Sequence, residues 1–501
     1  MLNLLTRTQY FLYFLQVKKP GLANPLVKLI GLAVKFDRLI PIDKLRLLSR
    51  SFFFYFSQYI KKISHTVEHI DSLRVTEDKY YLVRSMLNGA LRTRWTRRSL
   101  NTFLKVAFMN SEMRRLKAQW REKYGAGPPG FMVISPTKIC NLRCPNCYAN
   151  AATEADRLDY KVFSRIIQEA KELWGTRFFV LSGGEPLMYR SEGKSVLDLA
   201  RENENCMFMM YTNGFMIDDR IASELGDLGN LTPAISVEGL KESTDKRRGS
   251  GAFEKIIAVM KRLRKNKVLY GISITATKDN AKEIMSDEFI NFFFKKNCAS
   301  YGWIFHYMPI GRDVEIDLMP TPQQRIEMWQ RTWEIIRKKK IMLADFWNQG
   351  TISDGCIAGG REGGYLHINW HGDVAPCVFF PFAVSNINDI YQQGGTINDT
   401  INTPFFKAIR DWQKQYGYLS ASDGKKTNWL RPCPIRDHFL EARKIIKEYG
   451  ARPIDYAPHT LLDDEKYCQS LCQYDENLKE LTTPLWDKLY LNHNRKAVSK
   501  S

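Results

Sequence analysis

FMVISPTKICNLRCPNCYAN, residues 131–150, places a short apolar run directly before three closely spaced cysteines, Cys140, Cys144 and Cys147. The first five residues predict a β-strand, and the cysteines follow on one short loop. We expect no secretory signal before them, so three thiols at this spacing indicate ligands for a metal or an iron–sulfur cluster rather than disulfides. A cubane cluster that is held by three cysteines keeps one iron open for a further ligand.

Outward from this stretch, β-rich runs alternate with amphipathic helical runs. The predicted strands are Phe131–Ser135, Arg177–Leu181, Cys206–Tyr211, Thr232–Val237, Leu269–Thr275 and Tyr301–Tyr307. The predicted helices include Tyr160–Trp174, Ser195–Glu202, Phe253–Lys265 and Ala281–Lys296. Six such units predict an α/β fold with a parallel sheet or a partial (β/α)6 barrel, whose reactive groups lie at the carboxyl ends of the strands.

The second predicted strand ends in LSGGEP, residues 181–186. Gly183 and Gly184 allow a ligand to approach the backbone, and Glu185 supplies a carboxylate at the strand end. Turns are often rich in glycine and proline, so this loop alone is weak evidence for a site. Its position one strand after the cysteine loop is what makes it informative.

In this order, the motifs resemble the radical S-adenosylmethionine (radical SAM) superfamily from about residue 131 to residue 312. The resemblance rests on CNLRCPNCY (140–148), LSGGEP (181–186), YTNG (211–214), ISVEG (235–239) and DKRRGSGAF (245–253). It implies an enzyme with a [4Fe-4S] cluster whose open iron chelates S-adenosylmethionine. One electron then cleaves the sulfonium and releases a 5′-deoxyadenosyl radical.

The resemblance also implies roles for single residues. Cys140, Cys144 and Cys147 bind the cluster; Gly183, Gly184 and Glu185 meet the methionyl amino group; Ser236 meets the ribose; and Arg248 meets the methionyl carboxylate or, alternatively, has a capping or surface role. Where the family motif commonly ends in Ser-x-Asp-Gly, this chain has Glu238. Glu238 and Tyr307, the latter at the end of a predicted strand, are the predicted catalytic residues.

A second cysteine group lies in the loop-rich region after residue 346. Cys356 and Cys377 lie in GCIAGGREGGYLHINWHGDVAPC (355–377), which resembles the auxiliary-cluster extension called SPASM or its shorter twitch form. Cys433, Cys468 and Cys472 follow. We expect one auxiliary [4Fe-4S] cluster on Cys356, Cys377, Cys433 and one of the last two, with a second cluster or a plain buried strand pair as alternatives. Cys206, Cys298 and His306 are expected to be packed structural residues.

The chain's net charge of +20 is concentrated at one end. Residues 1–130 hold 24 basic and 8 acidic residues, a balance of +16, and the run Leu26–Phe36 has amphipathic helical spacing. GAGPPG, at residues 125–130, is the clearest linker. The predicted domains are a basic helical region (1–125), a radical SAM core (131–345) and an auxiliary-cluster region (346–501).

These features predict a cytoplasmic oxidoreductase, peripheral on the membrane face, with no signal peptide or transmembrane helix. The preferred substrate is a lipid or another membrane-associated apolar molecule, and a reducing partner such as ferredoxin or flavodoxin supplies the electron. The alternatives are a SPASM-type peptide or protein maturase, an RNA-modifying radical SAM enzyme, and a non-enzymatic zinc-binding adaptor. No specific nucleic acid is expected.

Overall fold

The computed structural model describes residues 70, 72–93, 96, 98–99, 102, 106, 111–153, 156–418, 427–456 and 462–491. Contacts divide the chain into two units, Met1–Asp78 with Leu489–Ser501, and Lys79–Lys488. In the first unit, the Tyr490 hydroxyl donates a hydrogen bond of 2.7 Å to Asp78. The predicted helix at residues 26–36 lies outside the described residues.

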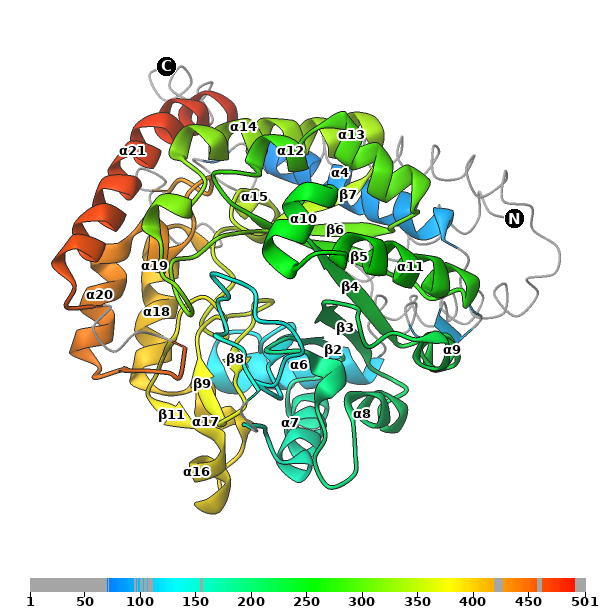
Figure 1. Cartoon of the computed structure of the whole chain (residues 1–501). Helices are drawn as coiled ribbons and strands as arrows, with labels where there is room; N and C mark the ends of the chain where they lie inside the picture. The colour runs from blue at the N-terminus through cyan, green and yellow to red at the C-terminus, as the bar shows by residue number, and fades with distance from the viewer. Residues whose placement is uncertain are drawn as a thin grey trace. The chain divides into compact units, whose positions relative to one another are not determined.

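The second unit is built on one ten-stranded sheet (Figure 1). Its first seven strands, which pair in parallel in chain order, are β1 (Met132–Ile134), β2 (Phe178–Leu181), β3 (Met207–Thr212), β4 (Leu231–Val237), β5 (Gly271–Ala276), β6 (Tyr301–His306) and β7 (Met342–Asp345). The predicted α/β fold with six parallel strands is confirmed. The sequence analysis missed β7, and β7 and β11 form the two ends of the described sheet.

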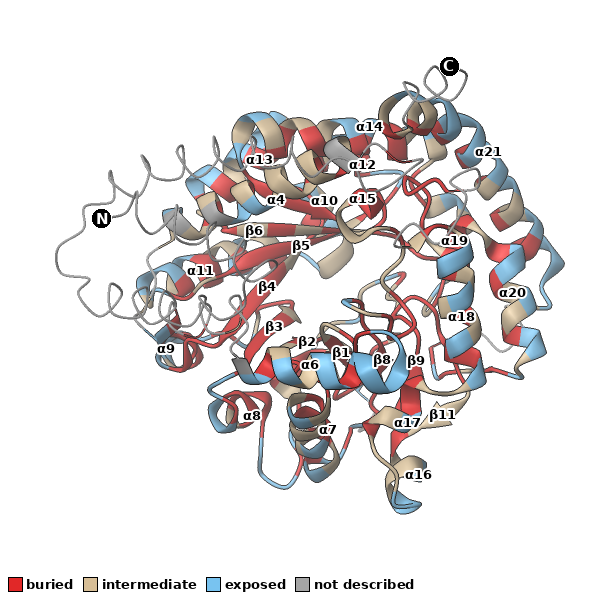
Figure 2. Ribbon diagram, turned by 180° about the vertical axis from the view of Figure 1, so that it is seen from behind, coloured by how far each residue is buried: buried red, intermediate tan, exposed pale blue. Residues whose placement is uncertain are grey.

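Helices between the strands cover the sheet, and Figure 2 shows buried strands beside helices whose outer faces are exposed. They are α7 (Tyr160–Leu173), α8 (Val196–Glu202), α9 (Asp219–Leu228), α10 (Lys241–Arg248), α11 (Ala252–Lys265), α12 (Ala281–Ile284), α13 (Asp287–Ile290), the π-helix η3 (Asn291–Lys296) and α14 (Pro322–Glu334). The helix predicted over residues 281–296 is therefore divided. Ser286 divides it, because its side chain accepts a hydrogen bond from the Phe289 amide and caps a new helix.

The strands after residue 346 continue the same sheet. β8 (His367–Ile368) pairs in parallel with β1, and β9 (Asp373–Ala375) and β11 (Ser385–Asn386) extend it in antiparallel fashion. The remaining elements are α4 (Ser72–Arg92), α6 (Ser111–Tyr124), the short helices η2 (Pro186–Met188), η4 (Ile316–Leu318) and η5 (Ile335–Lys339), α15 (Gly350–Ser353), the pair β10 (Phe382–Ala383) and β12 (Arg452–Pro453), α16 (Ile387–Gln392), α17 (Ile397–Ile401), α18 (Pro404–Gln415), α19 (Pro434–Asp437), α20 (Phe439–Glu448) and α21 (Glu465–Tyr490). The predicted domain boundary at residue 346 stays a prediction, and hydrogen bonds of the sheet run across it. No described helix is long and apolar enough to span a bilayer.

Candidate active site

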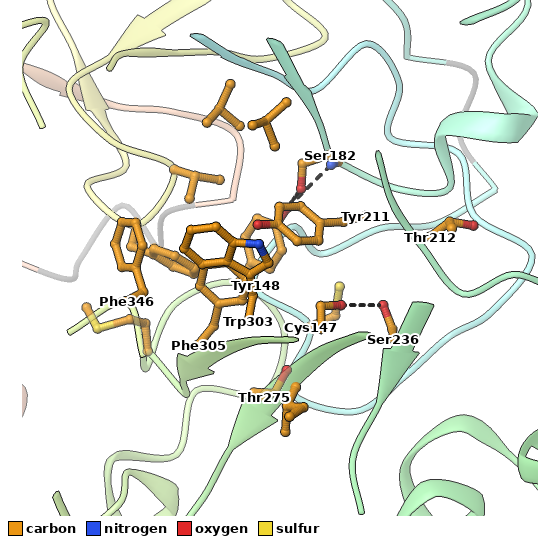
Figure 3. A pocket seen from close by; sticks show the side chains of 18 of the residues that line it. Cys147, Tyr148, Ser182, Tyr211, Thr212, Ser236, Thr275, Trp303, Phe305 and Phe346 are labelled. Carbon is orange, nitrogen blue, oxygen red and sulfur yellow. Dashed lines mark hydrogen bonds between the residues drawn. The ribbon is translucent and has the colours of Figure 1, made fainter. Parts of the chain in front are cut away.

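A cavity of about 320 Å³ opens against one face of the parallel sheet (Figure 3). Because side chains alternate between the faces of a strand, every second residue of several strands lines it. These alternating residues are Phe178 and Val180 on β2, Met209 and Tyr211 on β3, Ser273 and Thr275 on β5, and Trp303 and Phe305 on β6; Thr212, Ile274 and His306 line the cavity as well. The pleat of the strands thus directs these side chains into the cavity.

The lining changes in polarity along the strands. Aromatic and aliphatic side chains occupy the positions nearer the strand starts, whereas polar groups lie at or just beyond the carboxyl ends, at Ser182, Asn213, Ser236, Thr275 and Tyr307. The cysteine loop lies at this polar end, and all three of its cysteines line the cavity. The predicted site residues that line the cavity thus lie at the carboxyl ends of the strands, and their reactivity stays a prediction.

The cysteine loop presents three free thiols with a donor set suited to an iron–sulfur cluster. The Leu142 amide donates to the Cys140 Sγ at 3.4 Å. Burial raises the pKa of Cys140 to about 12, and burial also raises the pKa of Cys144, although Arg248 and Arg247 oppose that rise. As free side chains these two are therefore thiols, and ligation would require the loss of their protons, as it does for any thiolate ligand.

Gly311 and Arg312 hold the cysteine loop from beyond the sixth strand. The Arg312 amide donates to the Cys147 carbonyl at 3.0 Å, and its guanidinium donates to the Cys144 carbonyl at 2.9 Å. Gly311 has a φ of +81°, and a Cβ there would lie 2.2 Å from the Cys147 carbonyl oxygen. Only glycine permits this approach, and sequence reasoning had given neither residue a role.

Gly311→Ala should therefore lower the iron bound per chain after anaerobic reconstitution, by up to about half, because the loop must move to admit the methyl group while the second cysteine group keeps its iron. The matched control is Gly193→Ala. Gly193 has a φ of +71° with open space around its Cβ position, so it carries the backbone strain without the collision. Equal iron content in the two variants would contradict the role given to the close contact.

The Gly-Gly-Glu segment is also fastened to the cysteine loop. The Gly184 amide donates to the Thr137 carbonyl at 2.8 Å, and the Glu185 amide donates to the Ile139 carbonyl at 2.7 Å. Gly183 and Gly184 line the cavity, but the Glu185 carboxylate lies behind them, where it accepts from the Thr212 hydroxyl at 2.7 Å. Its predicted contact with an amino group stays a prediction, and its observed partners belong to the protein.

Glu238 is 2% exposed and is not among the residues that line the cavity. Its carboxylate accepts from the Arg247 guanidinium at 2.8 Å and from the Arg248 Nε at 2.9 Å. Both arginines do line the cavity. The structure thus places Glu238 as the residue that orients two cavity arginines, and Arg248 is not a surface residue.

The other predicted residues lie at the polar end of the cavity. The Ser236 hydroxyl is 3.2 Å from the Ser273 hydroxyl, and the Tyr307 hydroxyl accepts a 3.1 Å bond from the Glu315 amide. His306 is buried between Asp345, 3.1 Å from its Nε2, and Arg436, 3.3 Å from its Nδ1. Burial lowers the pKa of His306 to about 4, so it is a neutral, packed histidine, as expected.

Cys356, Cys377 and Cys433 line a second, smaller cavity of about 40 Å³. The Ala358 amide donates to the Cys356 Sγ at 3.4 Å, and the Phe379 amide donates to the Cys377 Sγ at 3.3 Å. This amide-to-sulfur arrangement, two residues after the cysteine, repeats the one at Cys140. Three soft donors with such amides fit an iron–sulfur cluster.

Cys468 and Cys472 do not line the second cavity. Both lie on α21, where the Cys468 Sγ donates to the Leu462 carbonyl at 3.5 Å. The structure therefore does not bring the expected fourth cysteine to the other three. The reason is that α21 packs Cys468 against the chain around Leu462, a long-range arrangement that cysteine spacing does not report.

Comparison with known proteins places the core of this site in one family. Residues 134–286 match the Radical SAM superfamily. The AdoMet-dependent heme synthase of Methanosarcina barkeri is 26% identical over 328 residues, which make up 60% of this chain and 89% of that enzyme. The cysteine-type anaerobic sulfatase-maturating enzyme of Clostridium novyi is 29% identical over 183 residues, 33% of this chain and 48% of that enzyme.

Among solved structures, SuiB of Streptococcus suis bound to S-adenosylmethionine aligns with a TM-score of 0.47 and 18% identity, over 59% of this chain and 71% of that chain. The family match spans Cys140, Cys144 and Cys147 and the Gly-Gly-Glu segment, whose contacts build one end of the cavity. The chain therefore contains a radical SAM domain, at residues 134–286, and is an enzyme.

Proposed function

We propose that this enzyme abstracts hydrogen from an unactivated C–H bond in an uncharged, largely hydrocarbon substrate, such as the chain of a lipid. The single observation that carries the proposal is the apolar lining of the cavity away from the carboxyl ends of the strands, the part that we call its deep end. An acid–base enzyme has no acidic proton to remove from such a bond, whereas a carbon radical takes the hydrogen atom directly.

The cofactors of the superfamily are a [4Fe-4S] cluster and S-adenosylmethionine. Bound together, they supply a 5′-deoxyadenosyl radical. In our proposal Cys140, Cys144 and Cys147 hold the cluster, and the polar end of the cavity holds the zwitterionic cofactor. Arg248, fixed by Glu238, presents a positive charge to a carboxylate there, and the Ser236 hydroxyl is placed to meet a ribose.

The deep end of the cavity is apolar. Among the described residues that line the cavity there is no Asp, Glu or Lys, and the only permanent charges are Arg247 and Arg248, which Glu238 holds at the polar end. A polar group buried there without a partner costs about 1–3 kcal/mol. A hydrocarbon gains about 25 cal/mol for each Å² that leaves water. The balance favours an apolar substrate over a peptide backbone.

The comparisons favour a second candidate, a tetrapyrrole, because the heme synthase aligns over most of its own length. A flat macrocycle suits an aromatic cavity, but its carboxylates would require cations that the deep end lacks. The peptide maturase alternative has the sulfatase-maturating relative in its favour. Both therefore serve as competing outcomes of the experiment.

The N-terminal region supports delivery from a membrane. Its excess of 16 positive charges, interleaved with aromatic residues, suits an anionic surface, where each basic residue contributes about 1 kcal/mol. We propose that this region docks the enzyme on the cytoplasmic face and that a small reductant such as ferredoxin or flavodoxin supplies the electron. Most of these residues lie outside the described part of the chain.

The decisive experiment follows the abstracted atom. Cells that lack this enzyme are grown in D₂O, and their lipid, tetrapyrrole and protein fractions are given separately to the reduced enzyme with unlabelled S-adenosylmethionine. Mass spectrometry should find deuterium in 5′-deoxyadenosine from the lipid fraction only. The Cys144→Ala variant is the blank. Deuterium from the tetrapyrrole or protein fraction alone would replace our substrate assignment with that class.

A further inference from the structure

The two cysteine-lined cavities share one aromatic wall. Four residues line both of them: Phe346, Ile357, Tyr365 and Phe379. Tyr365 is 1% exposed. Its position is fixed by the backbone, because the Tyr365 amide donates to the Ile357 carbonyl at 2.8 Å and its carbonyl accepts from the Gly360 amide at 2.9 Å. Tyr365 is thus one of the residues that separate the first cavity from the second, and its backbone is held in place.

The two parts of the Tyr365 side chain face different sites. Its ring stacks on Phe131, another residue of the first cavity, with ring centroids 4.9 Å apart and planes 15° apart. Its hydroxyl lies 2.8 Å from the Cys377 Sγ. When Cys377 binds a metal as a thiolate it has no proton to give, so the phenol must be the donor.

We propose that Tyr365 is a positioning residue that sets the reduction potential of a cluster at Cys356, Cys377 and Cys433 from within the wall of the radical cavity. A hydrogen bond to a ligating sulfur stabilises the reduced, more negative form of a cluster and raises its potential. The Phe379 amide already donates one such bond to Cys377, and the Tyr365 phenol adds a second that depends on a side chain. That Tyr365 also borders the space for the substrate rests on the proposed function, whereas the effect of Tyr365 on the reduction potential does not.

The test uses the full chain with Cys140, Cys144 and Cys147 all replaced by alanine, so that only the second site can hold a cluster. After anaerobic reconstitution with iron and sulfide, the midpoint potential is measured by a titration that is followed by electron paramagnetic resonance. Tyr365→Phe in this background should lower the potential, by about tenfold in the reduction equilibrium, which is about 59 mV for one electron.

Tyr189→Phe is the matched control. Tyr189 is fully buried and lines neither cavity, and its hydroxyl donates to the Leu158 carbonyl at 2.8 Å. Like Tyr365→Phe, this variant loses a buried phenol oxygen and the hydrogen bond that it donates, but that bond does not involve a cysteine. The potential of the Tyr189→Phe variant should equal that of the parent, because this change removes no hydrogen bond to a cysteine. A general loosening of the fold would instead shift the potential of both variants.

A second variant covers the case in which Tyr365→Phe fails to load iron. Fluorotyrosine at position 365 keeps the shape of the ring and donates more strongly, so it should raise the potential. An unchanged potential in both loaded variants overturns the proposal, and so does a second site that takes up no iron in the parent background. Neither result touches the proposed function, because this background cannot cleave S-adenosylmethionine and deuterium transfer is measured in the wild-type enzyme.

Discussion

Cys144→Ala should abolish the release of 5′-deoxyadenosine from S-adenosylmethionine. Cys144 lines the cavity between two other cysteines, and its carbonyl is held by Arg312. Loss of a residue that merely supports a ligand lowers metal affinity 10- to 100-fold, so loss of a ligand should lower cleavage by more than about 100-fold. The measurement is liquid chromatography of the nucleoside after anaerobic reconstitution and reduction.

Cys298→Ala is the matched control for Cys144→Ala. Cys298 lines neither cavity, and its Sγ lies near the carbonyls of Lys295 and Lys296. Cleavage should stay at the wild-type rate in this variant, because the same atom is removed at a position that lines neither cavity. Cleavage at an unchanged rate in Cys144→Ala would refute the ligand assignment.

Asp437→Ala should lower the free energy of unfolding by about 3–5 kcal/mol. The Asp437 side chain is fully buried, and its carboxylate accepts from Arg325 at 2.7 Å, from Arg436 at 3.0 Å and from the Cys433 amide at 3.3 Å. Alanine would leave two buried guanidinium groups without their counter-charge. Denaturation by urea, at one fixed state of cluster loading, measures the loss.

The pH dependence gives the same prediction a second readout. Burial would raise the pKa of Asp437, but Arg325 and Arg436 prevail and hold it far below its ordinary value. The contribution of this carboxylate to stability is therefore complete above the unfolded-state pKa of about 3.9 and is lost as the pH falls below it. Asp437→Ala should flatten the acid side of the stability profile.

Asp411→Ala is the control for Asp437→Ala. Asp411 pairs with Lys414 at 3.2 Å on the exposed face of α18, and both side chains are more than half exposed. Exposed pairs contribute about 0–1 kcal/mol, so this variant should stay within that range. If Asp437→Ala is no less stable than Asp411→Ala, the buried network does not stabilise the fold as argued.

The parallel strands were predictable because each is a short apolar run between helices, and the observed bounds differ from the predicted ones by at most two residues. The break in the helix at residues 281–296 was missed, because apolar periodicity continues through a point where Ser286 caps a new helix. β7 was missed as well. Its position at the end of the sheet depends on pairing with β6 rather than on a local pattern.

The first cysteine group was predictable because its three cysteines lie within eight residues on one loop. The second was predictable only in part, since Cys356, Cys377 and Cys433 meet through the packing of three separate segments, whereas Cys468 and Cys472 point elsewhere. The roles of Arg312, Glu238 and Tyr365 emerge only from contacts between residues far apart in the chain. A single sequence carries no record of such contacts.

The pairing of β8 with β1 fixes the separation of the two cysteine groups. Val133 is in register with His367, so the strand that leads into the first cysteine loop is paired by backbone hydrogen bonds with the segment between Cys356 and Cys377. Backbone hydrogen bonds, rather than a flexible tether, therefore set the span between the two cysteine groups. The separation of the two cysteine groups is therefore a property of the sheet itself.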